Sequence, residues 1–233
     1  MPQVEWNHET MRYALCFFPL VGCVIGLLEW GWSMLSGHMG LGMMFTAAIR
    51  VAIPVLVTGG IHLDGLLDTA DALSSHQEKE KKLEILKDSH AGAFAIIVCC
   101  VYFAVLFGAW SETDLKSVFV LGVGFALSRA LSGFGVTAIP AARGSGLSYT
   151  FRKQADRKRS RRILIAEIVI CMAAMILIDP LRGGCCAAVA AVVCLICYRM
   201  AMRQFGGTTG DIQGFFLCLC ELLMVCAAAL IPH

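Results

Sequence analysis

Three aspartates lie close together in the stretch TGGIHLDGLLDTADAL, residues 58–73. Asp64, Asp68 and Asp71 are spaced at i, i+4 and i+7, so on a helix they fall within about 60° of one another. Like charges on one helix face repel, and a divalent cation bridging a polyphosphate would relieve that repulsion. Mg²⁺ is a hard cation that is commonly held by one or two carboxylates together with substrate phosphates. The spacing therefore favours a magnesium–phosphate site, and the alternative interpretation is a helix that begins with solvated acids.

A glycine-rich loop, GGTTGD at residues 206–211, supplies a second set of groups suited to phosphate. Consecutive backbone N–H groups in such a loop can cradle phosphate oxygens, above all where the loop opens a helix. Gly207, Thr209 and Gly210 are candidate substrate contacts, and Asp211 is a fourth candidate metal ligand. The loop matches no Walker or Rossmann pattern, so a flexible turn between two helices is the alternative.

Other polar residues are candidates for contact with the substrate. Arg129 follows Ser128 inside an apolar run, where a charge is costly and more often functional than not. The remaining candidates are Lys87, Asp88 and Arg143. His62 precedes the first aspartate and could orient or deprotonate an attacking hydroxyl, although a lone histidine beside a glycine break is more often structural.

The composition places these motifs in a membrane protein. Of the 233 residues, 58% are hydrophobic and 15% charged, whereas soluble domains carry about 25% charged residues. The apolar residues occur in runs long enough to cross a bilayer, and the short alternating segments of a β-barrel do not stand out. We therefore expect an all-α fold, a polytopic membrane helix bundle that forms a single domain over residues 1–233. About seven spans are predicted, at residues 12–35, 41–60, 92–110, 117–140, 163–178, 185–202 and 215–231.

The second predicted span contains residues that interrupt a helix. Pro54 and the Gly59-Gly60 pair should kink or break it. Broken helices at membrane depth are tolerated where they line a polar cavity. The three aspartates follow at once, so we expect a polar cavity beside them. Arg50 lies in the same span and either marks its outer boundary or pairs with an acid in the bundle.

Twelve cysteines invite a disulfide or zinc interpretation, but nearly all of them lie inside apolar runs. Cys194 and Cys197 have CxxC spacing, yet they lie within a predicted span with no second pair and no nearby histidine. Structural zinc sites need further ligands to close them. We therefore interpret the cysteines as small buried apolar residues.

The distribution of lysine and arginine orients the bundle, because cytoplasmic segments carry most of the positive charge. The charged segments at residues 76–90, 143–162 and 199–203 are separated by two predicted spans each, so they share one side. That side is expected to be cytoplasmic. The acidic stretch and the glycine-rich loop then lie on the same face, as a shared active site requires. Residues 157–162 are expected to contact lipid.

Clustered carboxylates, a glycine-rich loop and a few cations together suit phosphoryl or phosphate-ester transfer. Such reactions need positioning and charge neutralisation, with few covalent demands on the protein. A nucleoside phosphate from the cytosol would be the leaving group, and a large or amphipathic acceptor would explain the membrane location. We expect the lipid bilayer as a partner and no nucleic acid, and the formation of a homo-oligomer is left open.

Several motifs occur in an order that is typical of one family: TGGIHLDGLLDTADAL, KLEILKDSHAGAFA, the Ser128-Arg129 pair, ARGSGL, and GGTTGDIQG with Glu221 beyond it. Through them the chain resembles the cobalamin synthases, or adenosylcobinamide-GDP ribazoletransferases, from about Tyr13 to Glu221. The resemblance implies Mg²⁺-dependent attack of α-ribazole, or its 5′-phosphate, on the corrinoid nucleotide adenosylcobinamide-GDP. GMP would leave, and adenosylcobalamin or its phosphate would form late in cobalamin biosynthesis. The implied location is the cytoplasmic membrane of a bacterium or archaeon, with the active site on the cytoplasmic face.

The resemblance also implies roles for individual acids. Asp64, Asp68 and Asp71 match the family's acidic motif and would hold Mg²⁺ on the diphosphate. Asp211 belongs to its TGD motif and would complete the metal site. Asp88 matches its KDS or RDS motif.

Lys87 and Arg129 are the candidates for contact with the phosphates in this interpretation. Family members usually carry a segment with an Arg-[Ile/Leu]-Pro motif before the first span. This sequence begins at about that point without the motif, so we expect either a late-assigned start or a shorter variant.

Two other classes of membrane protein compete with this interpretation. Transferases of the CDP-alcohol type also use clustered aspartates near a helix end, but there the DG pair is followed by AR, whereas here it is followed by LLDTAD. A cation-coupled transporter would need polar groups through the depth of several spans. The charged residues inside predicted spans are too few for such a path: Glu29, Arg50, Arg129 and Glu221.

Overall fold

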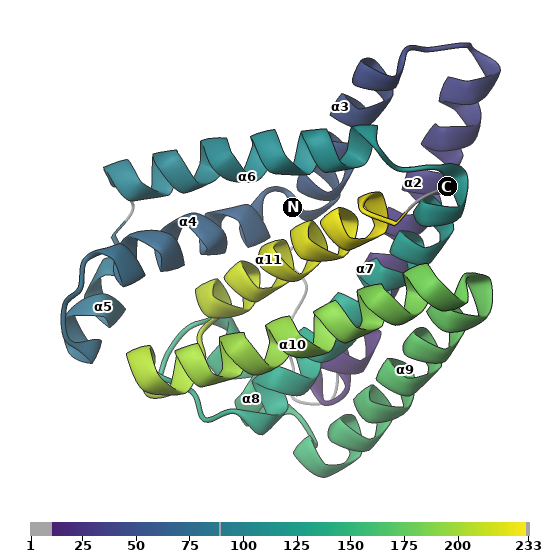
Figure 1. Cartoon of the computed structure of the whole chain (residues 1–233). Helices are drawn as coiled ribbons and strands as arrows, with labels where there is room; N and C mark the ends of the chain where they lie inside the picture. The colour runs from purple at the N-terminus through teal and green to yellow at the C-terminus, as the bar shows by residue number, and fades with distance from the viewer. Residues whose placement is uncertain (1–10, 89, 232–233) are drawn as a thin grey trace.

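The computed structural model of the chain describes residues 11–88 and 90–231. These residues form a bundle of helices, with one isolated β-bridge and no sheet among them (Figure 1). The all-α bundle expected from the sequence is confirmed. In chain order the elements are η1 (Ala14–Phe17), α2 (Phe18–His38), α3 (Met43–Thr58), α4 (Ile61–Ser74), α5 (Lys79–Ile85), α6 (Ala93–Ser111), α7 (Leu115–Ala138), α8 (Leu147–Gln154), α9 (Arg157–Ile178), α10 (Pro180–Phe205) and α11 (Gly210–Ala229).

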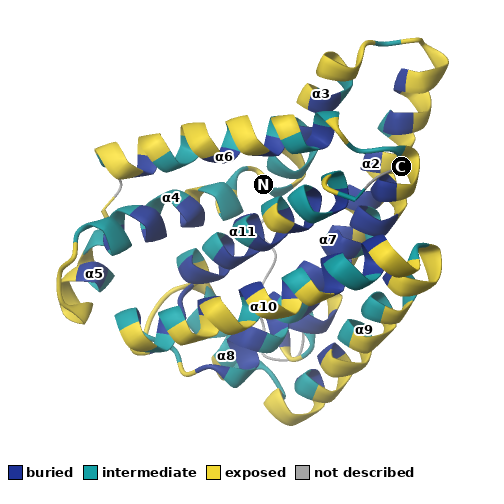
Figure 2. Ribbon diagram, viewed as in Figure 1, coloured by how far each residue is buried: buried dark blue, intermediate teal, exposed yellow. Residues whose placement is uncertain are grey.

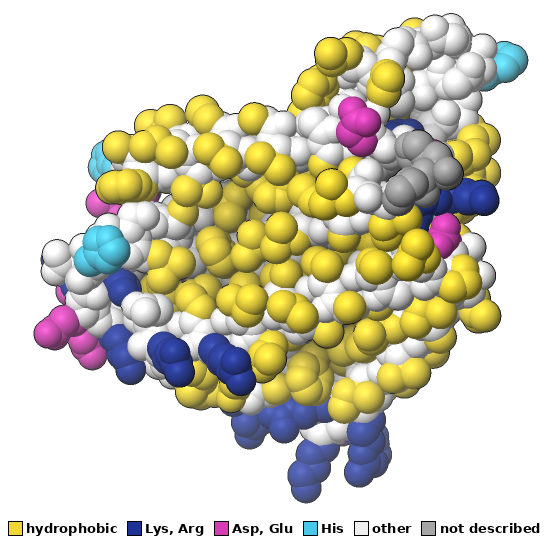
Figure 3. Space-filling model, in the orientation of Figure 1, with side chains coloured by type: hydrophobic (Ala, Val, Ile, Leu, Met, Phe, Trp, Pro, Cys, Tyr) yellow, Lys and Arg dark blue, Asp and Glu magenta, His cyan; other side chains and the backbone are white. Residues whose placement is uncertain are grey.

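Five helical segments in the described part of the chain are long and apolar enough to cross a membrane, and the bent pair α3 and α4 makes a sixth. About seven spans were predicted, and the difference is the predicted span at residues 163–178. It lies in α9, whose apolar stretch is flanked and interrupted by Arg161, Arg162 and Glu167, so it does not reach the apolar length of the others. Much of the surface between the ends of the bundle is hydrophobic (Figure 3), as a polytopic membrane protein requires.

Lysine and arginine side chains gather toward the lower left and the lower edge of Figure 3. The exposed cations there come from three parts of the chain: α5, the end of α10, and the first turns of α9. These are the three segments from which the sequence predicts a cytoplasmic side.

The break between α3 and α4 lies at Gly59 and Gly60, as predicted. Both glycines have positive φ angles, 62° and 78°, a left-handed conformation that side chains with a Cβ rarely adopt. The two helices meet at 93°. Pro54, in contrast, lies inside α3 without ending it. The glycine pair therefore turns the chain, and α4 leaves the bend carrying all three aspartates of the acidic stretch.

Helix α7 is the most buried helix in the bundle, and α2 packs along it (Figure 2). The two helices cross at Gly22 and Gly26. A Cβ atom at Gly22 would lie 2.3 Å from the carbonyl oxygen of Phe125, and one at Gly26 would lie 2.6 Å from that of Gly122. Close helix contact through small residues is the usual mode of packing in membranes. This crossing fixes η1 and the start of α2 against the C-terminal half of α7.

The sequence left two alternatives for Arg50: the outer boundary of its span, or a pair with an acid in the bundle. Its guanidinium donates hydrogen bonds of 2.9 Å to the hydroxyls of Ser33 and Thr113, and Thr113 belongs to the turn between α6 and α7. The Arg50 side chain is buried, and its guanidinium lies over the ring of Trp110. Arg50 therefore lies at the end of the bundle where the outward turn at residues 111–116 was predicted. Hydroxyls are its side-chain hydrogen-bond partners there, and the buried carboxylate of Glu29 lies near enough to attract its charge, so both alternatives hold in part.

Candidate active site

Helices α4 and α11 pack backbone against backbone and bring two acidic stretches together. A Cβ atom at Gly65 would lie 2.6 Å from the carbonyl oxygen of Asp211, and one at Gly214 would lie 2.9 Å from that of His62. Only glycine allows this approach from both sides. Asp64 precedes Gly65, so the first turn of α4 lies beside the first turn of α11.

A pocket of about 460 Å³ opens where these two turns meet, and we call it the α4–α11 pocket. Its charged lining comes from three separate parts of the sequence: Asp64 on α4, Arg143 in the loop before α8, and Asp211 on α11. His62 and Gly210 line it as well. Five of the candidate residues from the sequence therefore share one cavity.

The charges at this pocket are dominated by carboxylates. Arg143 forms an ion pair of 3.1 Å with Asp211, and the hydroxyl of Thr209 donates to the same carboxylate at 3.2 Å. Asp64, Asp71 and Asp211 lie near enough to Asp68 to repel its charge, and Arg143 is near enough to attract it. A second cation would lower the energy of this arrangement.

The donor set fits Mg²⁺ that is shared with a substrate. In the described residues, no group of three or more His, Cys, Asp and Glu side chains is gathered tightly enough to hold a metal ion by itself. Mg²⁺ does not need such a cage, because it is usually held by one or two carboxylates, with phosphate oxygens and water completing its six ligands. Asp64 and Asp211, which line the same pocket, meet that requirement.

Asp71 makes a contact that the sequence did not suggest. Its carboxylate accepts hydrogen bonds from the backbone N–H groups of Gly92 at 2.5 Å and Ala95 at 2.8 Å. These are the cap and the third residue of α6, which has two N-terminal N–H groups satisfied in this way. Asp71 thus joins the end of α4 to the start of α6, and its predicted role as a metal ligand competes with this contact.

Backbone N–H groups of the glycine-rich loop donate to backbone carbonyl groups of the protein, so they do not form an open row of donors for phosphate. The N–H of Gly207 donates to Ala201, and that of Thr208 donates to Pro140 at 2.8 Å. The N–H of Ala142 returns a bond of 3.0 Å to Thr208. The N–H group of Gly207 is therefore occupied within the protein, and its contact with substrate stays a prediction. The loop instead anchors residues 140–142 and so places Arg143, the next residue, against Asp211.

The end of the same loop begins α11. Thr209 is the N-cap of this helix, and its hydroxyl accepts a hydrogen bond from the N–H of Ile212 at 3.3 Å. Gly210 is the first residue of the helix and lines the pocket. An anion in the pocket would therefore lie near the positive end of the α11 dipole.

Ser128 and Arg129 lie away from the pocket, although both were candidates for substrate contact. Arg129 is fully buried between α7 and α11 and forms an ion pair with Glu221. The hydroxyl of Ser128 hydrogen-bonds the same carboxylate oxygen at 3.0 Å. These residues hold the two helices together, and neither lines the α4–α11 pocket.

Lys87 and Asp88 also lie outside the pocket lining. Both are exposed, on the segment that follows α5. Helix α5 is itself joined to α10 by a hydrogen bond from Lys82 to Gln204. The side chain and backbone N–H of His90 hydrogen-bond the carboxylate of Asp88 and hold the pKa of that acid below its ordinary value. Asp88 is thus engaged locally.

The apolar wall of the pocket was not predicted from the sequence. Phe17 reaches it from the end of η1 and Phe18 from the start of α2, and Leu147 and Phe151 reach it from α8. Helix α8 lies in what was interpreted as a basic loop. The i, i+4 spacing of Leu147 and Phe151 between polar residues was the available signal for it.

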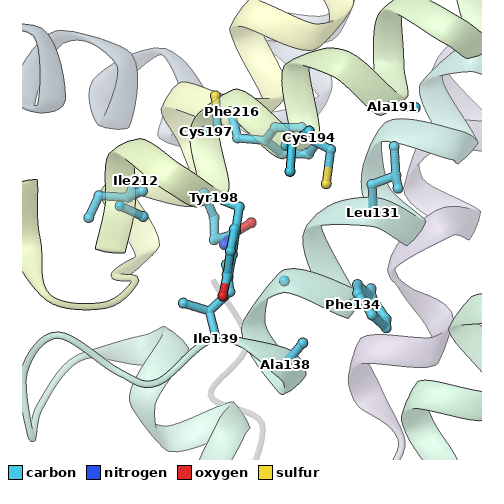
Figure 4. A pocket seen from close by; sticks show the side chains of 14 residues that line it. Leu131, Phe134, Ala138, Ile139, Ala191, Cys194, Cys197, Tyr198, Ile212 and Phe216 are labelled. Atoms are coloured by element: carbon cyan, nitrogen blue, oxygen red, sulfur yellow. The ribbon is translucent and has the colours of Figure 1, made fainter. Parts of the chain in front are cut away.

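A second pocket, of about 430 Å³, lies between α7, α10 and α11 (Figure 4). Its side chains are almost all apolar, among them Leu131, Phe134 and Phe216, with the hydroxyl of Tyr198 close by. The lining includes no acidic or basic side chain among the described residues. We therefore place the candidate chemistry in the α4–α11 pocket.

A family model described as cobalamin-5-phosphate synthase matches residues 1–229 of the chain. An adenosylcobinamide-GDP ribazoletransferase of Lachnoclostridium phytofermentans is 43% identical over 224 residues, which cover 96% of this chain and 85% of the relative. Proteins of the same name from Clostridium botulinum (strain Alaska E43) and Pseudomonas savastanoi pv. phaseolicola are 30% and 31% identical. They cover 99% and 96% of this chain, and the aligned parts make up 92% and 90% of the relatives. No solved structure matches the chain. The chain belongs to the cobalamin-5-phosphate synthase family.

Proposed function

We propose that this membrane protein joins α-ribazole, or α-ribazole 5′-phosphate, to adenosylcobinamide-GDP and releases GMP. The product is adenosylcobalamin or its 5′-phosphate, late in cobalamin biosynthesis. Relatives named for this transfer align over nearly the whole chain. The observation that carries the proposal is that Asp64, Asp211 and Arg143 line one pocket, where a diphosphate needs both a metal and a cation.

The transfer exchanges one phosphorus–oxygen bond for another. A ribose hydroxyl of α-ribazole attacks the phosphorus that is bonded to cobinamide. The bond between that phosphorus and the bridging oxygen breaks, and the bridging oxygen leaves with GMP. The hydroxyl proton must be accepted as the new bond forms. His62 lines the pocket beside Asp64 and is the candidate base.

Bound Mg²⁺ would neutralise charge on the diphosphate and on the leaving GMP. Asp64, Asp68 and Asp211 are the residues proposed to hold it, because their mutual repulsion favours a divalent cation. Asp71 belongs to the predicted ligand set as well, although its carboxylate caps α6. Arg143 is proposed to bind phosphate oxygens. Its Nη1 is buried and has no hydrogen-bond partner in the described residues, whereas its Nη2 bonds Asp211.

The proposed active site faces the cytoplasm. The exposed cations of α5, α9 and the end of α10 lie on the side where α4 ends and α11 begins, and cytoplasmic segments are rich in such residues. The GDP group and α-ribazole are then accessible from the cytosol. The broad corrin ring remains outside the pocket, which is too small for it.

The test uses membranes that contain the protein, incubated with adenosylcobinamide-GDP, α-ribazole and Mg²⁺. We expect GMP and a corrinoid product in equal amounts, with mass spectrometry identifying the corrinoid. Membranes with the Asp64→Asn variant are the matched control. GMP release without a joined corrinoid would indicate hydrolysis, and ion flux without GMP release would indicate a transporter. Either result would contradict the proposal.

A further inference from the structure

The α4–α11 pocket has two chemically different parts. Asp64 and Gly210 are exposed and Arg143 and Asp211 are partly exposed, so the charged groups lie at its mouth. The buried lining residues come from η1, α7 and α11 and are mainly non-polar, among them Leu15 at 8% exposure, Val136 at 6% and Leu217 at 1%. A ligand that fills this pocket needs an apolar end inside and a polar end at the mouth.

The polar groups in the buried part are already hydrogen-bonded to one another. The hydroxyl of Ser132 donates to the side-chain oxygen of Gln213 at 2.9 Å, and the Gln213 amide donates to the hydroxyl of Thr208 at 2.9 Å. A base that carries an amide and an amino group, such as guanine, would have to leave its own groups unpaired there or break this chain of bonds. Either change costs free energy.

Aromatic rings form the sides of the pocket. Phe17 comes from the end of η1, Phe18 from the start of α2 and Phe151 from α8. The ring of Phe18 meets the imidazole of His62 edge to face, with 5.9 Å between the centroids. Aromatic walls of this kind suit a flat apolar ring system.

We propose that the buried part of the pocket binds the base of α-ribazole, a benzimidazole with two methyl groups and no amide or amino substituent. The ribose then lies at the mouth, where His62, Asp64 and Arg143 surround the hydroxyl that attacks. The volume of about 460 Å³ is in the usual range for a small-molecule site. This inference deepens the proposed function and rests on it. The pocket selects the incoming nucleoside, and the guanine of the other substrate stays outside.

The experiment fills the buried part with Val136→Phe and measures steady-state GMP release in membranes. We expect the KM for α-ribazole to rise at least tenfold, and the KM for adenosylcobinamide-GDP to stay within twofold of the unmodified protein. The α-riboside of unmethylated benzimidazole is smaller. The variant should therefore prefer it, relative to α-ribazole, at least tenfold more strongly than the unmodified protein does.

Leu131→Phe is the matched control, because it adds the same side chain to the same helix but lines the second pocket (Figure 4). It should leave both KM values within twofold. If Val136→Phe does not accumulate in the membrane, Phe151→Ala decides the matter, since it removes a wall from the partly exposed helix α8. That variant should raise the KM for α-ribazole threefold or more and leave the other KM unchanged.

Two results would overturn the assignment. One is a selective rise in the KM for adenosylcobinamide-GDP, which would place guanine in the pocket. The other is an effect of Leu131→Phe on α-ribazole that equals or exceeds that of Val136→Phe, which would move the base to the second pocket. If the unmodified protein releases no GMP with either nucleoside, the proposed function itself fails, and the two failures remain distinct.

Discussion

Helix α11 carries two arginine–carboxylate pairs that differ in almost every respect. At its first turn, Asp211 pairs with Arg143, and both side chains keep about a fifth of their surface exposed at the mouth of a pocket. Ten residues later, about 15 Å along the helix, Glu221 pairs with Arg129, which is wholly buried against α7. The first pair can exchange a partner for a substrate, and the second cannot without exposing a charge to an apolar interior. A charged residue within a membrane span is therefore no proof of a substrate site.

The energetic consequence follows from burial. Removing one member of a buried pair leaves an uncompensated charge and typically costs about 3–5 kcal/mol. A pair at the mouth of a pocket is partly screened by water, so its contribution to folding is small. Changes at Glu221 should therefore act mainly on stability, and changes at Arg143 mainly on the substrate.

The largest expected effect is that of Glu221→Leu. Arg129 would remain buried without its partner, so we expect the free energy of unfolding to fall by about 3–5 kcal/mol. Thermal unfolding in detergent, followed by loss of the monodisperse protein, measures the change. The double variant Arg129→Met/Glu221→Leu should recover most of the stability. A Glu221→Leu protein that keeps its stability and loses only activity would contradict this difference between the two pairs. It would indicate that Arg129 acts in the active site.

Arg143→Lys should change binding by about tenfold, since lysine retains the charge but loses the planar fork that suits phosphate oxygens. We expect the KM for adenosylcobinamide-GDP to rise by that factor with little change in the melting temperature. Steady-state GMP release at fixed α-ribazole measures it. If the melting temperature falls and the KM is unaltered, Arg143 serves the fold like Arg129.

Asp71→Asn should destabilise the protein by about 1 kcal/mol, the usual range for a weakened helix cap. An asparagine retains one of the two oxygens that accept from Gly92 and Ala95. We expect GMP release within a few-fold of normal and a modest fall in melting temperature. Asp68→Asn is the matched comparison, because it makes the same change on the same helix at a residue proposed to hold the metal. A loss of turnover at Asp71 as deep as at Asp64 would assign Asp71 to the metal site, as the sequence predicted.

The smallest effect should come from Lys87→Ala. The side chain is exposed and does not line the pocket, and such charges contribute little. Turnover and both KM values should stay within about twofold. A clear rise in the KM for adenosylcobinamide-GDP would show that the segment after α5 reaches the substrate.

Local sequence signals predicted the elements better than the contacts between them. The Gly59-Gly60 bend and the apolar spans follow from glycine conformation and hydrophobic run length, which act within a few residues. The cap that Asp71 provides to α6 and the pairing of Thr208 with residues 140–142 join distant segments. Nothing in the spacing of either segment indicates its partner.

The candidate site shows the same division. Clustered aspartates and the TGD motif predicted Asp64 and Asp211 as candidates from their chemistry, and the structure brings these two acids to one pocket. The partners of Arg129, in an apolar run, and of Arg143, in a loop, were not identified, because the sequence around an arginine is the same whether a carboxylate or a substrate neutralises its charge. The meeting of Gly65 with Asp211 and of Gly214 with His62 decides which acids share a pocket, and it exists only in the packed bundle.

The most direct measurement of the central claim is a Mg²⁺ titration of GMP release in membranes, with the unmodified protein, Asp64→Asn and Asp211→Asn. If these two acids hold the metal on the diphosphate at the mouth of the α4–α11 pocket, the unmodified protein should lose activity with a chelator and regain it with Mg²⁺. Each variant should release GMP about 100-fold more slowly or require far more Mg²⁺, while still inserting into the membrane. Normal turnover by either variant at the same Mg²⁺ concentration, or full activity of the unmodified protein in excess chelator, would contradict the claim.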